Sequence, residues 1–363
     1  MSEIHRCWAE VSLTAIRRNV RAIRERVLPG TEIMAVVKAN AYGHGSVRVA
    51  GALSNEVESF GVANAEEAAV LGPQTRRIFL LSPCLPEERG RVIRSGWIPV
   101  VSSAGEAAAY SALGGCGINF KVDTGMGRIG CWHEEAEAEL DKVAALPGLH
   151  IHSISSHHPS ADDDPEFTRT QLEIFRGFCR RIAQKLPGVQ THIANSAGIF
   201  GFPAGGESLV RAGLSLYGVA SPASHQRVLE PALTWKSRLL LLREIPPGRS
   251  ISYGQTYTAS RTLRVASVAA GYADGYPWQV SGRGAGVLVH GRRCPVLGRV
   301  TMDQMLVDIS AVPEASVGDE VVLMGRDGAE EITASDLAQN AATIPWHILT
   351  GISARVARVY SDA

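Results

Sequence analysis

The chain has 363 residues, 45% of them hydrophobic, and its 36 lysines and arginines balance 36 aspartates and glutamates. This length exceeds what one hydrophobic core usually supports, so we expect two globular domains. Because the net charge is zero, the chain lacks the field that attracts nucleic acid or an anionic membrane surface. A small polar or zwitterionic substrate suits it better.

The N-terminal sequence MSEIHRCWAE has no apolar signal core, and no apolar run approaches the length of a transmembrane helix. We therefore expect a cytoplasmic protein. The six cysteines show no CxxC spacing, which argues against a disulfide framework and against a zinc site. We expect reduced thiols and no metal site.

Strand and helix patterns alternate over the first 211 residues. Alternating residues at 7–11 predict a half-buried strand, and Ser12 can cap a helix at about 14–27. Further helical patterns cover 65–71, 104–113, 134–145 and 167–185. Apolar strand-like runs follow at 33–37, 60–62, 78–81, 98–101, 118–122, 151–155, 190–194 and 209–211. Eight strands alternating with helices predict an α/β fold, a (β/α)8 barrel of TIM type.

After about residue 230 the pattern changes to short alternating runs, which predict a mostly β module. These runs are at 239–243, 263–267, 286–290, 305–309 and 320–324, and a final strand is expected at 354–360. One short helix is expected at about 333–342. A linker at 217–230, marked by Pro222, predicts a barrel domain at 1–225 and a β domain at 226–363. The first strand, at about 7–11, is a candidate to pair with the β domain.

Lys38 follows the apolar run 33–37, which reads as a strand buried on both faces, and precedes a glycine-rich turn. A lysine at such a strand end is desolvated enough to become a nucleophile, and it can form a Schiff base with an aldehyde such as pyridoxal phosphate. Tyr42 in the same turn offers a hydroxyl group. The alternative is a lysine that extends from a strand end into solvent.

Other reactive side chains also follow predicted strands, as expected of a barrel enzyme, whose chemistry lies at the C-terminal ends of its strands. They are Lys121, Arg128, His157, Asn195, Ser196 and Arg211. The loops after the last two strands of such barrels commonly bind phosphate. Ser196 and the backbone amides around Gly213 and Leu214 are therefore candidate ligands for a phosphate group.

Two arginines are suited to hold ligand groups. Arg128, in KVDTGMGRIG, can bind a substrate carboxylate through two parallel hydrogen bonds, or it can form an ion pair with Asp123. Arg211 can reach a pyridine nitrogen. A guanidinium there leaves the ring unprotonated and a weaker electron sink, which favours simple reprotonation over transamination. The alternative is a structural arginine at a strand end.

The segment SHHPSADDD at 156–164 holds two histidines and three acids. A metal cluster, as in a metal-dependent barrel hydrolase, is one interpretation. Metal ligands usually come from separated segments or helical spacing, so a solvated acidic loop is the better interpretation.

AVVKANAYGHG at 35–45 resembles the pyridoxal-lysine signature of the alanine racemase family, and the likeness extends over about residues 7–360. The other motifs that carry it are KVDTGMGRIG, HIANSAG, VRAGLSLYG, ISYGQTY, AGYADGY and GRVTMDQ. The resemblance implies that Lys121 is carbamylated and positions Arg128, and that His157 bridges Arg211 and a catalytic tyrosine. The cofactor-binding residues that we expect are Lys38, Tyr42, His157, Ser196, Arg211, Gly213 and Leu214.

Without the resemblance, Tyr253, Tyr272 and Met302 in the β module read as half-buried strand residues. The resemblance implies that Tyr253 is a second catalytic base, which reaches the active site of the partner subunit in a homodimer. It also implies that Tyr272 and Met302 shape the substrate entrance, where Arg128 binds the substrate.

The chain departs from the family pattern at three places. Trp278 stands where most members have an arginine, and Thr301 stands where a cysteine often precedes the methionine. Residues 345–347 read Pro-Trp-His in place of the common Asn-Tyr-Glu. That tyrosine normally donates to the cofactor phosphate, and Trp346 has only an indole N–H to offer.

The resemblance implies an isomerase, an alanine racemase that interconverts L-alanine and D-alanine for peptidoglycan with pyridoxal phosphate as cofactor. Lys38 and Tyr253 would act as bases on opposite faces of the cofactor–substrate Schiff base. A serine or broad-specificity racemase is the alternative. A barrel-type amino-acid decarboxylase would present an acid where Arg211 stands, and a non-catalytic pyridoxal phosphate carrier would lack the β module with Tyr253.

Overall fold

The computed structural model describes residues 5–202, 205–220 and 223–362. Pro222, part of the expected linker, lies outside these ranges. The described residues form two compact units. The barrel unit consists of 16–41 and 46–230, and the β unit consists of the described residues of 1–15, 42–45 and 231–363.

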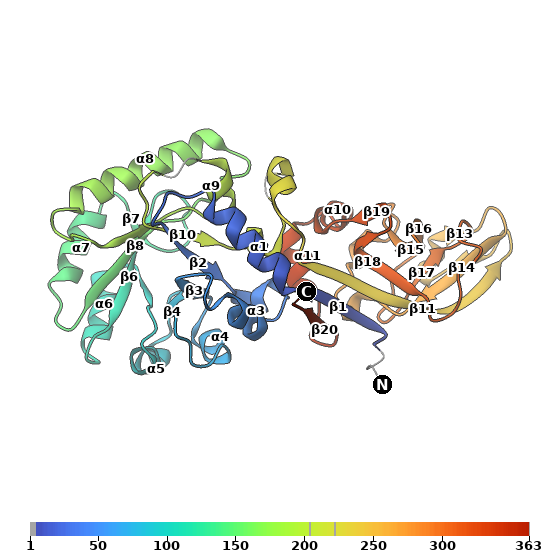
Figure 1. Cartoon of the computed structure of the whole chain (residues 1–363), viewed down its shortest axis with the longest axis horizontal. Helices are drawn as coiled ribbons and strands as arrows, with labels where there is room; N and C mark the ends of the chain where they lie inside the picture. The colour runs from blue at the N-terminus through green and yellow to red at the C-terminus, as the bar shows by residue number, and fades with distance from the viewer. Residues whose placement is uncertain (1–4, 203–204, 221–222, 363) are drawn as a thin grey trace. The chain divides into compact units, whose positions relative to one another are not determined.

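Eight parallel strands form the centre of the barrel unit (Figure 1). They are β2 (Glu32–Val36), β3 (Ser59–Val62), β4 (Arg77–Leu80), β5 (Val100–Val101), β6 (Gly117–Asp123), β8 (His150–Ser155), β9 (Gln190–His192) and β10 (Leu209–Ala212). They pair in the orders β10-β2-β3-β4 and β5-β6-β8-β9, and β7 (Cys131–Trp132) pairs beside β6.

Two sets of backbone contacts join these groups of strands into a ring. A parallel bridge links Phe79 of β4 to Ile98, just before β5. On the other side, the Ser208 amide donates to the Thr191 carbonyl at 3.1 Å and the Arg211 amide donates to the Ala194 carbonyl at 3.0 Å. The eight strands therefore close, and the predicted (β/α)8 barrel is confirmed.

The helices of this unit begin where polar side chains cap their first turns. Asn64, Ser103, Asp164 and Asn195 each accept a backbone N–H of the helix that follows. The helices are α1 (Leu13–Arg24), α3 (Ser46–Leu53), α4 (Ala65–Val70), α5 (Arg89–Ser95), α6 (Ala104–Ser111), α7 (Ala136–Ala144), α8 (Pro165–Ile182) and α9 (Ser196–Gly201). The sequence patterns missed α3, α5 and α9, because one or two turns contain too few positions to show a period.

The β unit is built on a nine-stranded sheet of order β19-β18-β15-β16-β17-β14-β11-β1-β20. The strands are β1 (Cys7–Ser12), β11 (Leu233–Ile245), β14 (Leu263–Val268), β15 (Gly286–Val289), β16 (Arg292–Leu297), β17 (Met305–Asp308), β18 (Glu320–Asp327), β19 (Glu330–Ile332) and β20 (Ala357–Ser361). The long strand β11 alternates buried and half-buried residues and also pairs with β18, so six strands from β18 to β11 close into a ring. β1 pairs antiparallel with β11 and parallel with β20.

A separate hairpin consists of β12 (Ser250–Ile251) and β13 (Tyr257–Thr258). Two helices follow β19, α10 (Ala334–Asn340) and α11 (Pro345–Gly351). The expectation of a single helix in this module was therefore wrong. Pro345 fits the first turn of α11, where its missing N–H costs nothing, but the seven-residue element is too short to show a helical pattern.

Among the described residues, no helix combines the length and the apolar composition needed to cross a membrane. All six cysteines are free thiols.

Candidate functional site

Lys38 opens an unusual turn, α2 (Lys38–Tyr42), directly after β2. Ala39, Asn40, Ala41 and Tyr42 all have left-handed φ values between 50° and 54°. Left-handed helical backbone costs an L-residue roughly 1–2 kcal/mol, so four in succession store on the order of 4–8 kcal/mol. Surrounding contacts must hold this turn in place.

One of these contacts comes from Glu67 in the first turn of α4. One carboxylate oxygen accepts the Ala39 N–H and the other accepts the Ala63 N–H, both at 2.7 Å. Asn40 contributes a further bond, since its side-chain oxygen accepts the Ser46 N–H at 2.9 Å. The backbone that carries Lys38 is thus tied to the end of β3.

The half-buried Lys38 has a pKa below its ordinary value. Burial is the main cause, and the positive charges of Arg128 and Arg211 lower the pKa further while Glu67 opposes them. A lowered pKa increases the fraction of neutral amine, which is the nucleophilic form.

A second lysine, Lys121, lies within β6 and is only 8% exposed. Burial, with Arg211 and Arg128 nearby, holds its pKa well below the ordinary range. Asp123 accepts the backbone N–H groups of residues 125, 126 and 127 at 2.8 Å and so closes the turn before Arg128. Among the described residues it forms no ion pair with Arg128, whose side chain is exposed.

Arg211 in β10 is buried and donates to five acceptors. Burial lowers its pKa to about 10, so it stays charged at neutral pH. The acceptors are the carbonyls of Ser156, His192 and Ile193 and the Nδ1 atoms of His157 and His192. All these bonds use Nη1 and Nη2. Within the described part of the chain, Nε–H is the donor of Arg211 that has no partner.

These contacts assign the proton positions on two histidines. A guanidinium can only donate, so Nδ1 of His157 (3.0 Å) and Nδ1 of His192 (2.6 Å) must accept, and each neutral ring carries its proton on Nε2. Burial and the Arg211 charge hold both pKa values well below the ordinary range, which keeps the rings neutral. His157 can therefore donate from Nε2 to a further group.

The loops after β9 and β10 meet at Ser196. Its oxygen accepts the Gly213 N–H at 2.9 Å, the Ser215 N–H at 3.2 Å and the Ser215 hydroxyl at 3.0 Å. These bonds use the lone pairs of the Ser196 oxygen, so its own hydrogen remains to donate. The amide of Leu214 has no backbone acceptor among the described residues.

In the β unit, the expected second base and the two residues expected at the substrate entrance lie at the surface. Tyr253 is 71% exposed, Met302 is 53% exposed and Tyr272 is 44% exposed. Tyr42, which the sequence placed near the cofactor, also belongs to this unit and is buried.

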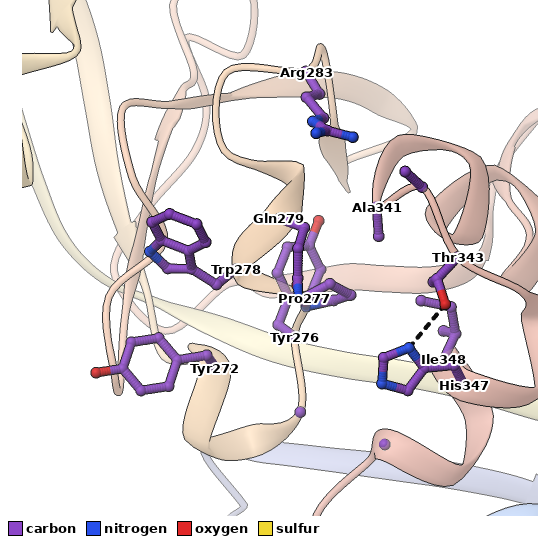
Figure 2. Close-up of a pocket in the computed structure, with 13 residues that line it drawn as sticks. Tyr272, Tyr276, Pro277, Trp278, Gln279, Arg283, Ala341, Thr343, His347 and Ile348 are labelled. Carbon is purple, nitrogen blue, oxygen red and sulfur yellow. Dashed lines mark hydrogen bonds between the residues drawn. The ribbon is translucent and has the colours of Figure 1, made fainter.

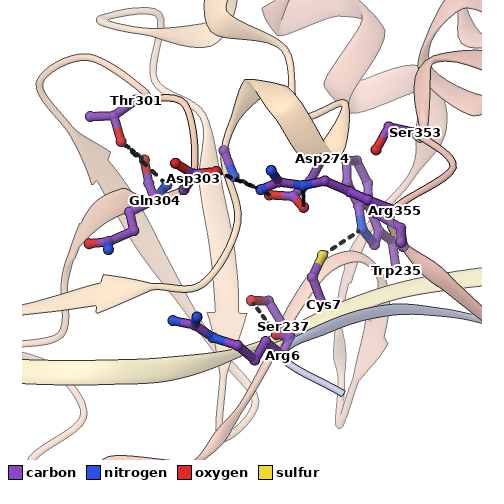
Figure 3. A network of polar contacts seen from close by, with 12 residues as sticks. Arg6, Cys7, Trp235, Ser237, Asp274, Thr301, Asp303, Gln304, Ser353 and Arg355 are labelled. Atoms are coloured by element: carbon purple, nitrogen blue, oxygen red, sulfur yellow. Dashed lines mark hydrogen bonds and ion pairs between the residues drawn. The ribbon is translucent and has the colours of Figure 1, made fainter.

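Arg355 joins the two turns that carry Tyr272 and Met302 (Figure 3). It donates to both oxygens of Asp274, at 2.7 and 3.0 Å, and to Asp303 at 2.8 Å. Asp274 is the last residue of the turn Tyr272–Asp274, and Asp303 directly follows Met302. No sequence pattern indicates this link.

A pocket of about 940 Å³ lies beside these turns, between the segment 272–283 and the region of α11. Figure 2 shows Tyr272 and Trp278 on one side and Thr343, hydrogen-bonded to His347 at 2.8 Å, on the other. Trp346 in α11 is half-buried, and its carbonyl accepts the Thr350 hydroxyl at 2.7 Å.

The acidic loop does not gather metal ligands. His158 is buried, and its Nδ1 lies 3.4 Å from the Gln171 side-chain oxygen. Across the described residues, no three histidine, cysteine or acidic side chains are arranged to hold a metal ion.

Two residues that contribute to this site, Glu67 and His192, were not predicted from the sequence. Glu67 lies in the segment NAEE, a capping pattern whose partner on another strand cannot be read from the sequence. His192 opens HIANSAG, the motif of which only Asn195 and Ser196 were predicted to belong to the site.

A closed barrel with two lysines of lowered pKa and a buried arginine at the ends of its strands, followed by a β unit, defines a two-domain barrel enzyme with amine chemistry. Residues 11–221 match the family model for the alanine racemase N-terminal domain, and residues 232–360 match that for the C-terminal domain. The chain belongs to the alanine racemase family.

Individual relatives agree over nearly the whole chain. The alanine racemase of Symbiobacterium thermophilum is 41% identical, with 97% of this chain and 96% of that protein covered. That of Methylacidiphilum infernorum is 38% identical, with coverages of 98% and 92%. The solved alanine racemase of the D-cycloserine producer Streptomyces lavendulae has a TM-score of 0.91 at 36% identity, with coverages of 100% and 98%. The family, the fold class and the racemase class predicted from the sequence are confirmed.

Proposed function

We propose that this chain interconverts L-alanine and D-alanine with pyridoxal phosphate bound to Lys38. The observation that carries the proposal is the rim of the barrel, where the Lys38 amine has a lowered pKa and Arg211 offers an Nε–H without an acceptor among the described residues. Pyridoxal phosphate supplies an electron sink that stabilises negative charge at the α-carbon of a bound amino acid.

The residues present fit this cofactor. The Lys38 amine can bind its aldehyde carbon, and the Arg211 Nε–H can donate to its ring nitrogen. The phosphate would accept from the Ser196 hydroxyl and the Leu214 amide, while the Gly213 amide holds Ser196 in position. Tyr42 is a further candidate to bind the cofactor, whereas Trp346 has no hydroxyl to contribute.

Arg211 also selects the reaction. Its guanidinium is fixed by five acceptors and stays charged, so it would donate to the ring nitrogen of the cofactor and could not take up a proton from it. An acidic residue at this position, which is expected of a barrel-type decarboxylase, would instead stabilise a protonated ring nitrogen. The arginine therefore favours a racemase over a decarboxylase.

Racemisation requires proton transfer on both faces of the bound amino acid, which needs two bases on opposite sides. We assign one face to the Lys38 amine and the other to Tyr253 of the partner subunit. His157 carries its proton on Nε2 and can donate to that tyrosine oxygen, which favours the phenolate needed for a base.

Arg128 is assigned to the substrate carboxylate and Lys121 to the position of Arg128. Lys121 is buried and its pKa lies well below the ordinary range, which increases the fraction of neutral amine, the form that reacts with carbon dioxide to give a carbamate. A carbamate would convert this buried group into an anion able to accept from Arg128.

We further propose a homodimer with shared active sites in the cytoplasm. The exposure of Tyr253, Tyr272 and Met302 supports the dimer, because a partner subunit would cover these side chains. A non-catalytic pyridoxal phosphate carrier would need no such surface.

The experiment is to incubate the purified chain with pyridoxal phosphate and single L-amino acids in deuterium oxide. We expect L-alanine to yield D-alanine that carries deuterium at its α-carbon, because the proton returned comes from solvent-exchanged groups. Chiral chromatography and mass spectrometry measure both changes. Faster turnover of L-serine would identify a serine racemase, and retention of configuration for every amino acid would refute the proposal.

A further inference from the structure

The barrel unit contains two helices that begin in the same way but differ in one contact. In α4, Glu67 is the third residue after the cap Asn64, and in α6, Glu106 is the third residue after the cap Ser103. Each carboxylate accepts the N–H of the residue before its cap, from Ala63 at 2.7 Å and from Ser102 at 2.8 Å.

Only Glu67 also holds a second segment of the chain. Its other oxygen accepts the N–H of Ala39, the residue directly after Lys38, at 2.7 Å. The Glu106 carboxylate has no such second backbone contact among the described residues. A carboxylate that accepts two N–H groups from separate segments fixes the distance and direction between them.

We propose that Glu67 is a positioning residue that holds the left-handed turn of Lys38 against the end of β3 and thereby directs the Lys38 amine. This inference rests on the proposed function, in which Lys38 binds pyridoxal phosphate.

The strain of the turn explains why such a contact is needed. Four consecutive non-glycine residues, Ala39 to Tyr42, are left-handed, and L-residues leave this conformation when nothing holds them. Within the barrel unit, the bonds across this turn include those of Glu67, of Asn40 and of the Ala41 amide with the Val37 carbonyl. Glu67 acts on Ala39, closest to the reactive lysine.

The charge of Glu67 acts in the same place. It raises the pKa of Lys38 against the combined effect of burial, Arg128 and Arg211. Loss of the carboxylate would therefore change both the direction and the protonation of the amine, whereas loss of a cap alone would change neither.

The test compares Glu67→Ala and Glu67→Gln with two controls, Glu106→Ala and Glu66→Gln. Glu106→Ala removes the matching capping contact in α6. Glu66→Gln removes the same charge from the neighbouring exposed residue of α4. Glu67→Gln keeps one acceptor oxygen but turns an NH2 group toward the other N–H. We therefore expect this variant to remain folded, with effects between those of the parent and those of Glu67→Ala.

In the cofactor-free chain, we expect amide exchange at Ala39 to be about tenfold faster in Glu67→Ala, because a charge-assisted bond is lost. On titration with pyridoxal phosphate, the dissociation constant should rise about tenfold in the same variant. Both quantities should be intermediate in Glu67→Gln, between the values of the parent and of Glu67→Ala. In both controls they should stay within about twofold of the parent. With alanine, kcat should fall more than KM rises, because the amine is misdirected and the carboxylate site is intact.

Equal exchange at Ala39 and equal cofactor affinity in Glu67→Ala and Glu106→Ala would make Glu67 an ordinary helix cap and overturn the proposal. The exchange measurement needs no cofactor. If the parent chain binds no pyridoxal phosphate on Lys38, the proposed function fails, and the comparison of exchange rates still decides whether Glu67 holds the turn.

Discussion

Replacing Tyr253 with phenylalanine should lower racemisation of alanine by roughly 10²–10⁴-fold, the usual cost of losing a general base. The change removes one hydroxyl from a side chain that is 71% exposed, so the fold and the binding of pyridoxal phosphate should survive. Initial rates in both directions, with cofactor content measured by absorbance, give the result. Tyr257→Phe, in the same hairpin region, is the matched control and should retain the parental rate.

The loss of α-proton exchange in Tyr253→Phe should also differ between the two alanine isomers. Lys38 still exchanges the α-proton of the isomer that it faces, so that isomer alone should take up deuterium without inversion. Equal residual exchange of both alanine isomers would mean that Tyr253 is not the base on the second face.

Mixing subunits tests whether the tyrosine crosses to the partner. A heterodimer of Tyr253→Phe and Lys38→Ala chains has one site with both defects and one site with both groups intact. Activity should therefore reappear after subunit exchange. Mixed dimers that stay inactive would show that Tyr253 serves the Lys38 of its own chain.

Arg211→Glu should lower racemisation by at least about 10²-fold, in line with the removal of one preorganised electrostatic contact. A carboxylate can accept a proton shared with the ring nitrogen, so negative charge at the α-carbon would persist longer and return of the proton would slow. Stopped-flow spectra with alanine should then reveal a new long-wavelength band. A parental rate with no new band would show that Arg211 does not contact the ring.

This variant also needs a control for folding. Arg211 satisfies three buried carbonyls and two histidines, and breaking such a buried network costs about 3–5 kcal/mol. Arg211→Lys keeps the charge but cannot reach all five acceptors, so it should lose comparable stability without the new spectral band. Melting temperatures of both variants separate the chemical effect from the structural one.

The sequence predicted the barrel well, for a physical reason. Strands buried on both faces are continuous apolar runs, and eight of these occur between residues 33 and 211 with helical patterns between most of them. Because parallel strands all present their C-terminal ends at one rim, Lys38, Lys121 and Arg211 could be grouped without knowledge of any contact.

What the sequence could not predict are contacts between segments far apart in the chain. Nothing local shows that Glu67 accepts from Ala39, or that Arg355 links Asp274 to Asp303, because both depend on the packing of strands and turns. A capping pattern predicts where a helix begins. The second hydrogen-bond donor to a capping carboxylate depends on the tertiary structure and cannot be read from that pattern.

The left-handed turn after Lys38 could not be predicted from the sequence either. Asparagine tolerates this conformation as a single residue, but alanine and tyrosine do not favour it, so nothing in the sequence predicts four such residues in succession. The roles of Tyr253, Tyr272 and Met302 came from the family resemblance alone, since exposed residues in a β module have no pattern that identifies a shared site.

Reduction with borohydride tests most directly the claim that Lys38 holds the cofactor. The chain is loaded with pyridoxal phosphate, reduced, digested and mapped by mass spectrometry. We predict a visible absorbance near 420 nm, roughly, that disappears on reduction, because a lysine joined to the pyridoxal ring extends its conjugation. The reduced pyridoxyl group should then be found on Lys38. Recovery of that group on Lys121 or any other lysine, with Lys38 unmodified, would contradict the account.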